Sequence, residues 1–173
     1  TLYSDVDDLE VGSVTVDGMT VTGLVTSNDD AKLMVGGNLA INEIVSLGTG
    51  NLFLAVDGNV SQTASITANG LGLMVGGTTT LQDPANNVAI IAADNQGTTL
   101  YRDLDDLQIS VITVDGMTIR GFRVDSDLTL LIGGDLNQRS DSPIIVSGIT
   151  ELTVTGNICL AYADGLGAAG ISD

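Results

Sequence analysis

The chain has 173 residues, with 22 acidic and five basic side chains, a net charge of −17 and no histidine. This charge argues against binding to nucleic acid or to an anionic membrane surface, since both require basic groups. The missing histidine excludes histidine-dependent catalytic triads and metal sites that contain histidine. The residues are 43% hydrophobic but only 3% aromatic, with 22 glycines, which favours thin stacked strands over a bulky core. No apolar run approaches the ~20 residues of a membrane span, so membrane insertion is not expected.

One segment of the chain occurs twice. Thr1–Gly23 returns as Thr99–Gly121 at an offset of 98 residues, with 14 of 23 positions identical. Self-similarity at a fixed period indicates a repeat architecture, in which each unit buries its apolar face against its neighbours. We therefore expect one repeat domain over residues 1–163, with a first unit at 1–98 and a partial second unit at 99–163. Residues 164–173 lose the pattern and are expected to form a linker or a frayed end.

A shorter period lies within the long one. A strand-like run that ends in a glycine recurs at intervals of 19, 21, 19, 39, 18 and 22 residues, so that one step is about 20 residues and 98 residues are about five steps. Glycine supplies positive φ at a tight corner, so these glycines are predicted to form the structural turns. They are Gly18, Gly37, Gly58, Gly77, Gly116, Gly134 and Gly156.

Two or three short strands per step, one glycine corner and no helix predict an all-β fold, a right-handed parallel β-helix (β-solenoid) with ~20-residue coils. A β-sandwich would need turns every 8–12 residues and would not explain the step. Eight or nine coils would give a rod on the order of 40 Å long at about 4.8 Å per coil. No capping helix is evident, so both end coils are expected to expose strand edges that need a continuation, a partner or a cap.

The repeating pattern also predicts the positions of three asparagines and of the single cysteine. Asn38, Asn59 and Asn157 each follow a corner glycine and are expected to stack into a ladder. The single cysteine, Cys159, lies in the apolar run 158–161 and is expected to be a small buried hydrophobe.

An acidic cluster follows the tyrosine in each copy of the repeat. Alternation along an extended strand puts the first two carboxylates of each cluster on one face, where they are calcium ligands in principle. The other interpretation is a solvated acidic corner that keeps the rod soluble and blunts lateral strand pairing. The candidate calcium ligands are Asp5, Asp7, Asp8, Asp103, Asp105 and Asp106. The two tyrosines, Tyr3 and Tyr101, are expected at coil corners with their hydroxyls in water, or as platforms for sugar rings.

Three phrases of the sequence carry a resemblance. Gly58–Leu71, GNVSQTASITANGL, and then Pro84–Ala93, PANNVAIIAA, resemble repeats of filamentous-haemagglutinin-like exported bacterial surface proteins. Leu100–Leu107, LYRDLDDL, resembles the segment that follows in those repeats. The resemblance covers roughly residues 1–160. It implies a right-handed β-helix, export by a two-partner secretion system, and a role in adhesion, surface layers or biofilm.

The function expected from these observations is a non-enzymatic shaft segment of an exported surface filament or adhesin. Such a segment would associate end to end or continue a longer array, with host or matrix glycans as further partners. It would need no cofactor, calcium excepted. Two alternatives stay open: a polysaccharide lyase or hydrolase, with Arg102 or Arg120 beside a calcium held by the second acidic cluster, and a binding module for calcium or glycans.

Overall fold

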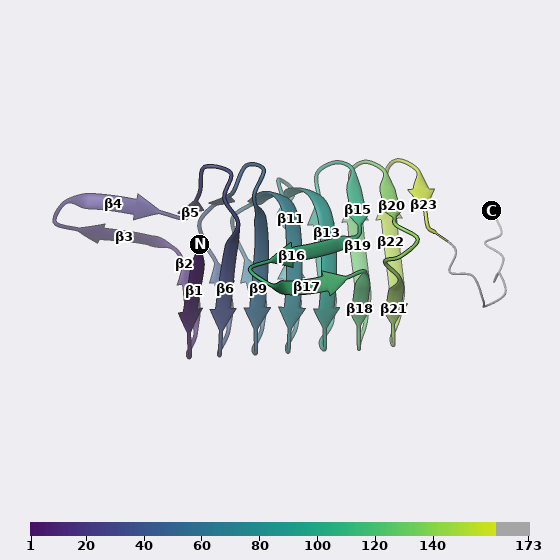
Figure 1. Ribbon diagram of the computed structural model, residues 1–173, viewed down its shortest axis with the longest axis horizontal. Helices are drawn as coiled ribbons and strands as arrows, with labels where there is room; N and C mark the ends of the chain where they lie inside the picture. Colours follow the sequence, from purple (N-terminus) through teal and green to yellow (C-terminus); the bar gives the residue numbers. More distant parts are fainter. Residues whose placement is uncertain (162–173) are drawn as a thin grey trace.

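The computed structural model describes residues 1–161, and all its regular elements are strands. Of the 23 strands, the 19 of the two large sheets stack into a β-solenoid of about six turns, and the other four form two hairpins (Figure 1). No helix occurs among the described residues. Successive coils lie about 21 residues apart, so that Val60, for example, pairs with Leu39 of the coil before it. The predicted all-β solenoid of stacked parallel coils is therefore confirmed. Residues 164–173, expected to be a linker or frayed end, lie outside the described residues.

One side of the rod is a seven-stranded parallel sheet. Its strands are short and rich in branched residues, and each pairs with the equivalent strand one coil away. In order they are β2 (Leu9–Val11), β7 (Leu39–Ile41), β10 (Val60–Gln62), β12 (Thr79–Leu81), β14 (Thr99–Asp103), β19 (Leu128–Ile132) and β22 (Thr150–Val154).

The other two sides share a 12-stranded sheet, because its two longest strands each run along both of them. β11 (Ile66–Val75) pairs with β8 (Val45–Ser46) near its start and with β9 (Asn51–Val56) further along. β13 (Asn87–Asn95) pairs in the same way with β15 (Leu107–Ile109) and then β18 (Phe122–Val124). The remaining strands are β1 (Leu2–Asp5), β5 (Leu24–Val25), β6 (Ala31–Val35), β20 (Leu136–Gln138), β21 (Ile144–Val146) and β23 (Ile158–Cys159).

Side chains that point into the rod form columns through the stack. Leu52, Leu71 and Ile91 are in register on neighbouring coils, and none of them has measurable exposure. The polar groups of the interior are paired as well: Asn95 Nδ2 donates to Thr99 Oγ1 at 2.9 Å, and every buried polar side-chain atom of the described residues has a partner. Each coil thus buries its apolar face only against its neighbours, as the repeat predicted.

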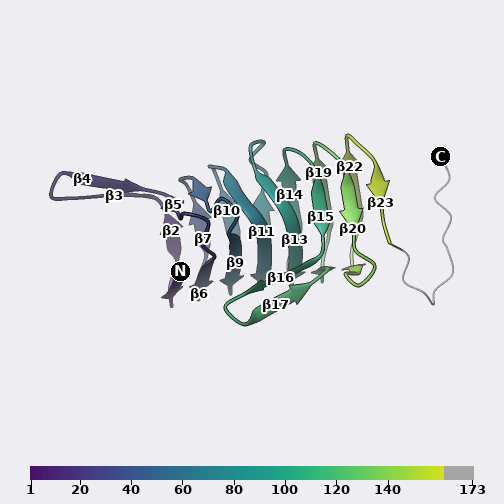
Figure 2. The ribbon, with the colours of Figure 1, turned by 45° about the horizontal axis from the view of Figure 1, so that its top comes forward.

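Two antiparallel hairpins interrupt the coils. β3 (Ser13–Val16) pairs with β4 (Met19–Thr22), and β16 (Val111–Val114) pairs with β17 (Met117–Arg120). The first hairpin projects beyond the end of the rod along its axis, whereas the second lies back along its side (Figures 1 and 2). The hairpins take residues out of the coils, which explains why the rod has about six turns and not eight or nine.

The long repeat and the coils are out of phase. β1 lies in the 12-stranded sheet next to β6, whereas its repeat, β14, lies in the seven-stranded sheet between β12 and β19. The expected equivalence of 98 residues with about five coils is therefore wrong. Each unit contains one hairpin, which leaves fewer residues for its coils. The strand order β2-β7-β10-β12-β14 shows that the chain has completed only four coils between β2 and β14, so that equivalent segments of the two units fall on different sides of the rod.

Candidate functional site

The second acidic cluster contains a buried acid–phenol pair. Tyr101 and Asp103, at the end of β14, both point into the rod, and the tyrosine hydroxyl donates to Asp103 Oδ2 at 2.6 Å. The backbone N–H of Val88, on the preceding coil, donates to the same oxygen at 3.1 Å. Tyr101 is therefore a core residue, and its expected position at a corner with the hydroxyl in water is wrong.

Burial dominates the titration of this pair. It raises the pKa of Asp103 to about 6, against the opposing effect of the hydrogen bonds from Tyr101 and from backbone N–H groups. Burial, and then the neighbouring Asp103 carboxylate, raise the pKa of Tyr101 well above its ordinary value. Asp103 is thus a carboxyl that the fold keeps partly protonated near neutrality.

The first copy repeats this local geometry at the end of the rod. The Tyr3 hydroxyl donates to Asp5 Oδ2 at 3.3 Å, and the N–H of Asp7 donates to Asp5 Oδ1 at 3.0 Å. Tyr3 is 46% exposed, whereas Tyr101 is completely buried. The same sequence therefore makes the same contacts within a strand, and the neighbouring coil decides its burial.

The last aspartate of each cluster supports the next coil. Asp8 Oδ1 accepts the backbone N–H of Asn38 at 2.6 Å, and Asn38 Oδ1 then accepts the N–H of Asn59 at 2.9 Å. Asn59 Oδ1 in turn accepts the N–H of Thr78 at 2.8 Å. The expected stacking of Asn38 on Asn59 is thus present, and it starts from an aspartate.

A second ladder of this kind begins at Asp106. Its Oδ1 accepts the N–H of Asp135 at 2.7 Å, and Asp135 Oδ1 accepts the N–H of Asn157 at 2.7 Å. Asn157 therefore stacks on an aspartate and not on the other two asparagines. In both ladders one side-chain oxygen per coil satisfies a backbone N–H of the following corner.

The acidic residues of a cluster do not share one face. Asp103 ends its strand and points inward, while Asp105 is exposed and accepts Asn87 Nδ2 at 3.2 Å. Within residues 1–161, no group of three or more acidic or cysteine side chains is arranged to hold a metal ion. Calcium binding by these clusters stays a prediction, which titration calorimetry of the purified chain would test.

Five of the seven predicted corner glycines do stack at corners. The N–H of Gly58 donates to Gly37 O, and the N–H of Gly77 donates to Gly58 O, both at 2.9 Å. A Cβ at Gly77 would lie 2.7 Å from Gly58 O. Positive φ is the wrong reason for glycine at these corners, because it is not found at any of the five, which include Gly134 and Gly156. Close backbone approach between coils is the physical reason.

The other two glycines belong to hairpins. Gly18 and Gly116 both have φ of 77°, and each follows an aspartate with positive φ, Asp17 or Asp115. Two successive residues with positive φ form the two-residue turn that matches the twist of a β-hairpin. The Asp-Gly pair flanked by alternating apolar residues was the sequence signal for these hairpins.

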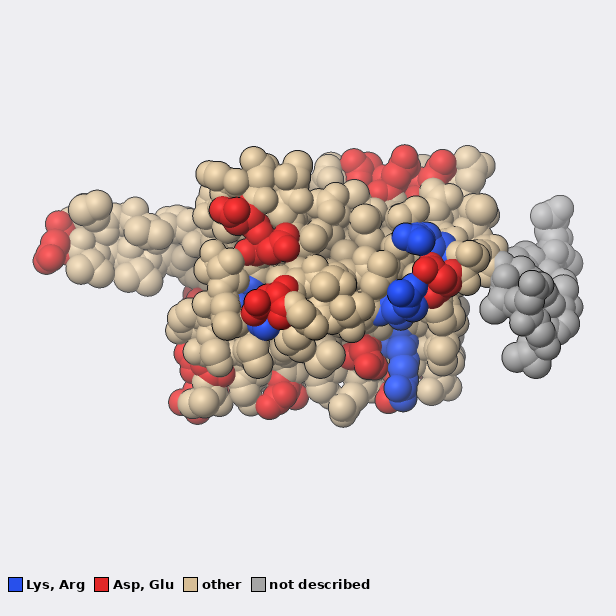
Figure 3. Space-filling view, viewed as in Figure 1, with Lys and Arg blue, Asp and Glu red and all other residues tan. Residues whose placement is uncertain are grey.

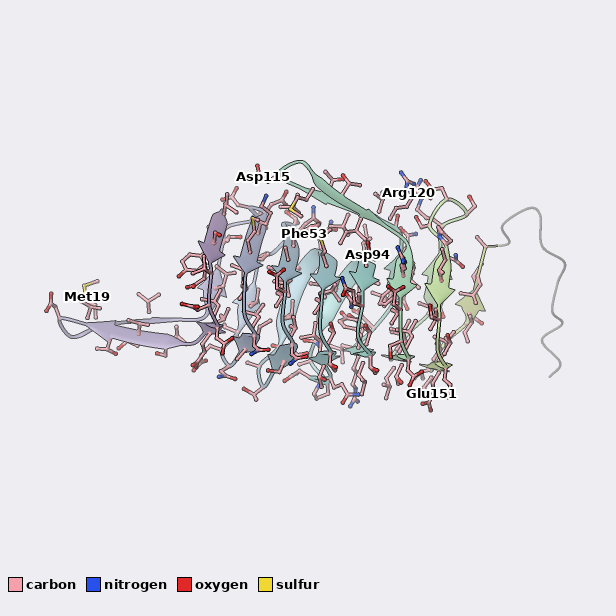
Figure 4. The ribbon with its side chains drawn as sticks, turned by 90° about the horizontal axis from the view of Figure 1, so that it is seen from below. Met19, Phe53, Asp94, Asp115, Arg120 and Glu151 are labelled. Atoms are coloured by element: carbon pink, nitrogen blue, oxygen red, sulfur yellow. The ribbon has the colours of Figure 1, made fainter. Side chains whose placement is uncertain are left out.

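The second hairpin is packed onto the outer face of the preceding coils. Ile112, Val114 and Ile119 from the hairpin form a separate apolar cluster with Phe53 of β9 and Ala92 of β13. Phe53 points out of the coil, yet the hairpin covers it completely (Figure 4). This tertiary contact was not predicted from the sequence.

An ion pair holds the tip of this hairpin. Lys32 Nζ lies 2.9 Å from Asp115 Oδ2, and the lysine side chain is almost fully covered. The hydrogen bond from Lys32, together with its charge, lowers the pKa of Asp115. At the base of the hairpin, Arg120 Nη1 lies 2.5 Å from Asp141 Oδ2. The ion-pair partner of Arg120 is therefore Asp141 and not the buried Asp103. Figure 3 shows basic side chains beside acidic ones on the face of the rod that carries this hairpin.

The remaining candidate features lie on the surface. A shallow groove of about 550 Å³ crosses four consecutive coils, and its lining includes Asp57, Met74, Asp94, Arg123 and Asp125. Arg123 Nη2 lies 3.2 Å from Asp125 Oδ1. Cys159 is exposed on β23 as a free thiol, so its expected burial is wrong: it takes the outward position next to Asn137.

Comparisons of the chain with protein-family models, with curated protein sequences and with solved structures each gave no match.

Proposed function

We propose that this chain is a non-enzymatic structural segment, the shaft of an exported bacterial surface filament or adhesin. One observation supports this most: hydrogen bonds connect each coil to the next at its sheets and at its corners. The corner bonds from Gly77 through Gly58 to Gly37 run parallel to the rod axis, as do the side-chain ladders. Stretching or bending such a rod strains the bonds on several sides at once, which makes it a stiff spacer.

The charges of the rod fit the same role. Acidic side chains outnumber basic ones by 22 to five, and on the face shown in Figure 3 they lie in several groups along the rod. Neighbouring rods should therefore repel one another while their ends can still stack. The resemblance to exported filamentous proteins supports the cell surface as the location. Histidine is absent from the sequence, and Asp103, a residue of the alternative enzyme proposal, is buried with Tyr101.

The experiment is labelling of the cells that make the protein. Antibodies against the purified chain should decorate intact cells along thin surface projections, seen by immunogold electron microscopy. Labelling only after the cells are broken would overturn the surface role. Antibody that has been absorbed with the purified chain is the matched control.

A glycan-binding role is a second proposal, favoured by the groove over Asp94 and Arg123. An arginine beside carboxylates offers both donors and acceptors to sugar hydroxyls. Binding of glycans on an array, lost in Arg123→Ala, would support it. Assays on acidic polysaccharides with calcium present address the enzymatic alternative, and release of oligosaccharides would favour that alternative over a purely structural role.

A further inference from the structure

The duplicated 23-residue segment presents the same apolar residues in two environments. In the second hairpin, Ile112 and Val114 are only 2% exposed. Their counterparts in the first hairpin, Val14 and Val16, are each 62% exposed. Met19 and Val21 are exposed as well, and Figure 4 shows Met19 on the hairpin that projects beyond the rod. The first hairpin therefore carries an apolar face that nothing covers within residues 1–161.

The second hairpin shows which surface such a face fits. It lies across β9, β11 and β13, three coils that precede it in the stack. Gly70 and Gly72 make room for it, because a Cβ at Gly72 would lie 3.1 Å from Ile112 Cγ2. Phe53 supplies the apolar contact, and Lys32 pairs with the aspartate of the turn. We call these outward-facing residues of β6, β9, β11 and β13 the acceptor face.

The strands beside the two hairpins show the same difference. Tyr101 is buried between Leu81 and Leu130, its register partners on either side, and Asp103 receives an N–H from the preceding coil. Tyr3 and Asp5 have a neighbouring coil on one side alone in the described structure. An open apolar groove of about 350 Å³ lies there, lined by residues that include Tyr3, Leu9, Val14 and Leu33.

We propose that this end of the rod is a docking site for β-solenoid coils of the type formed by Ala31–Asn95. Those coils stack on β1 and β2, donate a backbone N–H to Asp5, and present an acceptor face that the β3–β4 hairpin covers. Their lysine pairs with Asp17, the only charged residue of this hairpin. The occupant is a repeat unit in the same stack, joined before Thr1, because the acceptor face of a separate intact chain is already covered by its own β16–β17 hairpin.

This inference rests on the proposed role as a rod segment, and one experiment separates the two. Residues 1–98 are fused in register before Thr1 of the full chain, which gives Thr1–Gly23 the neighbours that Thr99–Gly121 has. Single cysteines are placed in a Cys159→Ser background, and alkylation rates are measured. Val16→Cys in the full copy reports the apolar face. Val114→Cys is the buried reference, and Thr15→Cys on the opposite face of the hairpin is the exposed reference.

The proposal predicts that alkylation at position 16 slows about 10-fold or more in the fused chain, toward the rate at position 114, while position 15 stays reactive. Gly72→Val in the added unit should restore reactivity at position 16. If electron microscopy shows a longer rod but position 16 stays reactive, this inference is overturned and the rod proposal survives. A fused chain that does not lengthen overturns both. If alkylation at position 16 of the unfused chain slows as the protein concentration rises, a separate molecule occupies the site, and the proposal is also overturned.

Discussion

The corner glycines lead to a quantitative prediction, because two kinds of glycine can be compared in one molecule. Alanine at Gly77 would place its Cβ 2.7 Å from Gly58 O, well inside the roughly 3.4 Å of an ordinary contact. The two coils would have to separate locally by about 0.7 Å on that basis. This separation stretches the bond from Gly77 N–H to Gly58 O, now 2.9 Å, and the bond from Thr78 N–H to Asn59 Oδ1, now 2.8 Å.

The two hydrogen bonds contribute about 2 kcal/mol together, at about 1 kcal/mol each, so Gly77→Ala should lower the free energy of unfolding by about that amount. Gly116→Ala is the matched control. Its φ of 77° strains alanine, but a Cβ there meets no atom within 4 Å, so the expected cost is about 1 kcal/mol. Urea unfolding followed by circular dichroism measures both variants. Equal losses, or a larger loss for Gly116→Ala, would refute coil-to-coil contact as the reason for the corner glycines.

Three further predictions concern other parts of the rod. The pKa of Asp103 is raised to about 6 in the folded state, so the folded chain binds a proton that the unfolded chain does not, and the free energy of unfolding should be about 1 kcal/mol higher at pH 5 than at pH 7. Asp103→Asn should remove this difference. An equal loss of stability from pH 7 to pH 5 in both proteins would contradict the prediction. Phe53→Ala should lower the free energy of unfolding by about 3 kcal/mol, since the ring is fully buried under the hairpin, and a loss below about 1 kcal/mol in urea unfolding would contradict that packing. Cys159 should react with iodoacetamide in the native chain as fast as in urea, and strong native-state protection, measured by mass spectrometry, would contradict its outward position.

The sequence predicted the solenoid well because its signal is periodic. Glycines about 20 residues apart, short branched runs between them and the Asn38–Asn59 pair all follow from coils that repeat the same corner. The reason given for the glycines was wrong, since φ is a local property whereas the approach of Gly77 to Gly58 depends on stacking.

The features that were missed are tertiary. Val14 and Ile112 stand in nearly identical sequences, yet one is exposed and the other buried, because the coils beside them differ. The Asp-Gly turn was counted among the coil corners although it also fits a hairpin, and only the pairing of β16 with β17 separates the two. Tyr101 and Asp103 were predicted at the surface because tyrosine hydroxyls and carboxylates usually contact water. Both are buried because the hydroxyl donates a hydrogen bond to the carboxylate, which replaces the contact with water.

Stacked corners should make a rod whose length grows with the number of repeats. The most direct measurement is electron microscopy of chains that carry one, two and four 98-residue units joined in register. At about 4.8 Å per coil, four to five coils per unit predict a rod of constant width that lengthens by about 20 Å with each unit. A string of compact particles, or a width that grows with unit number, would contradict a continuous solenoid.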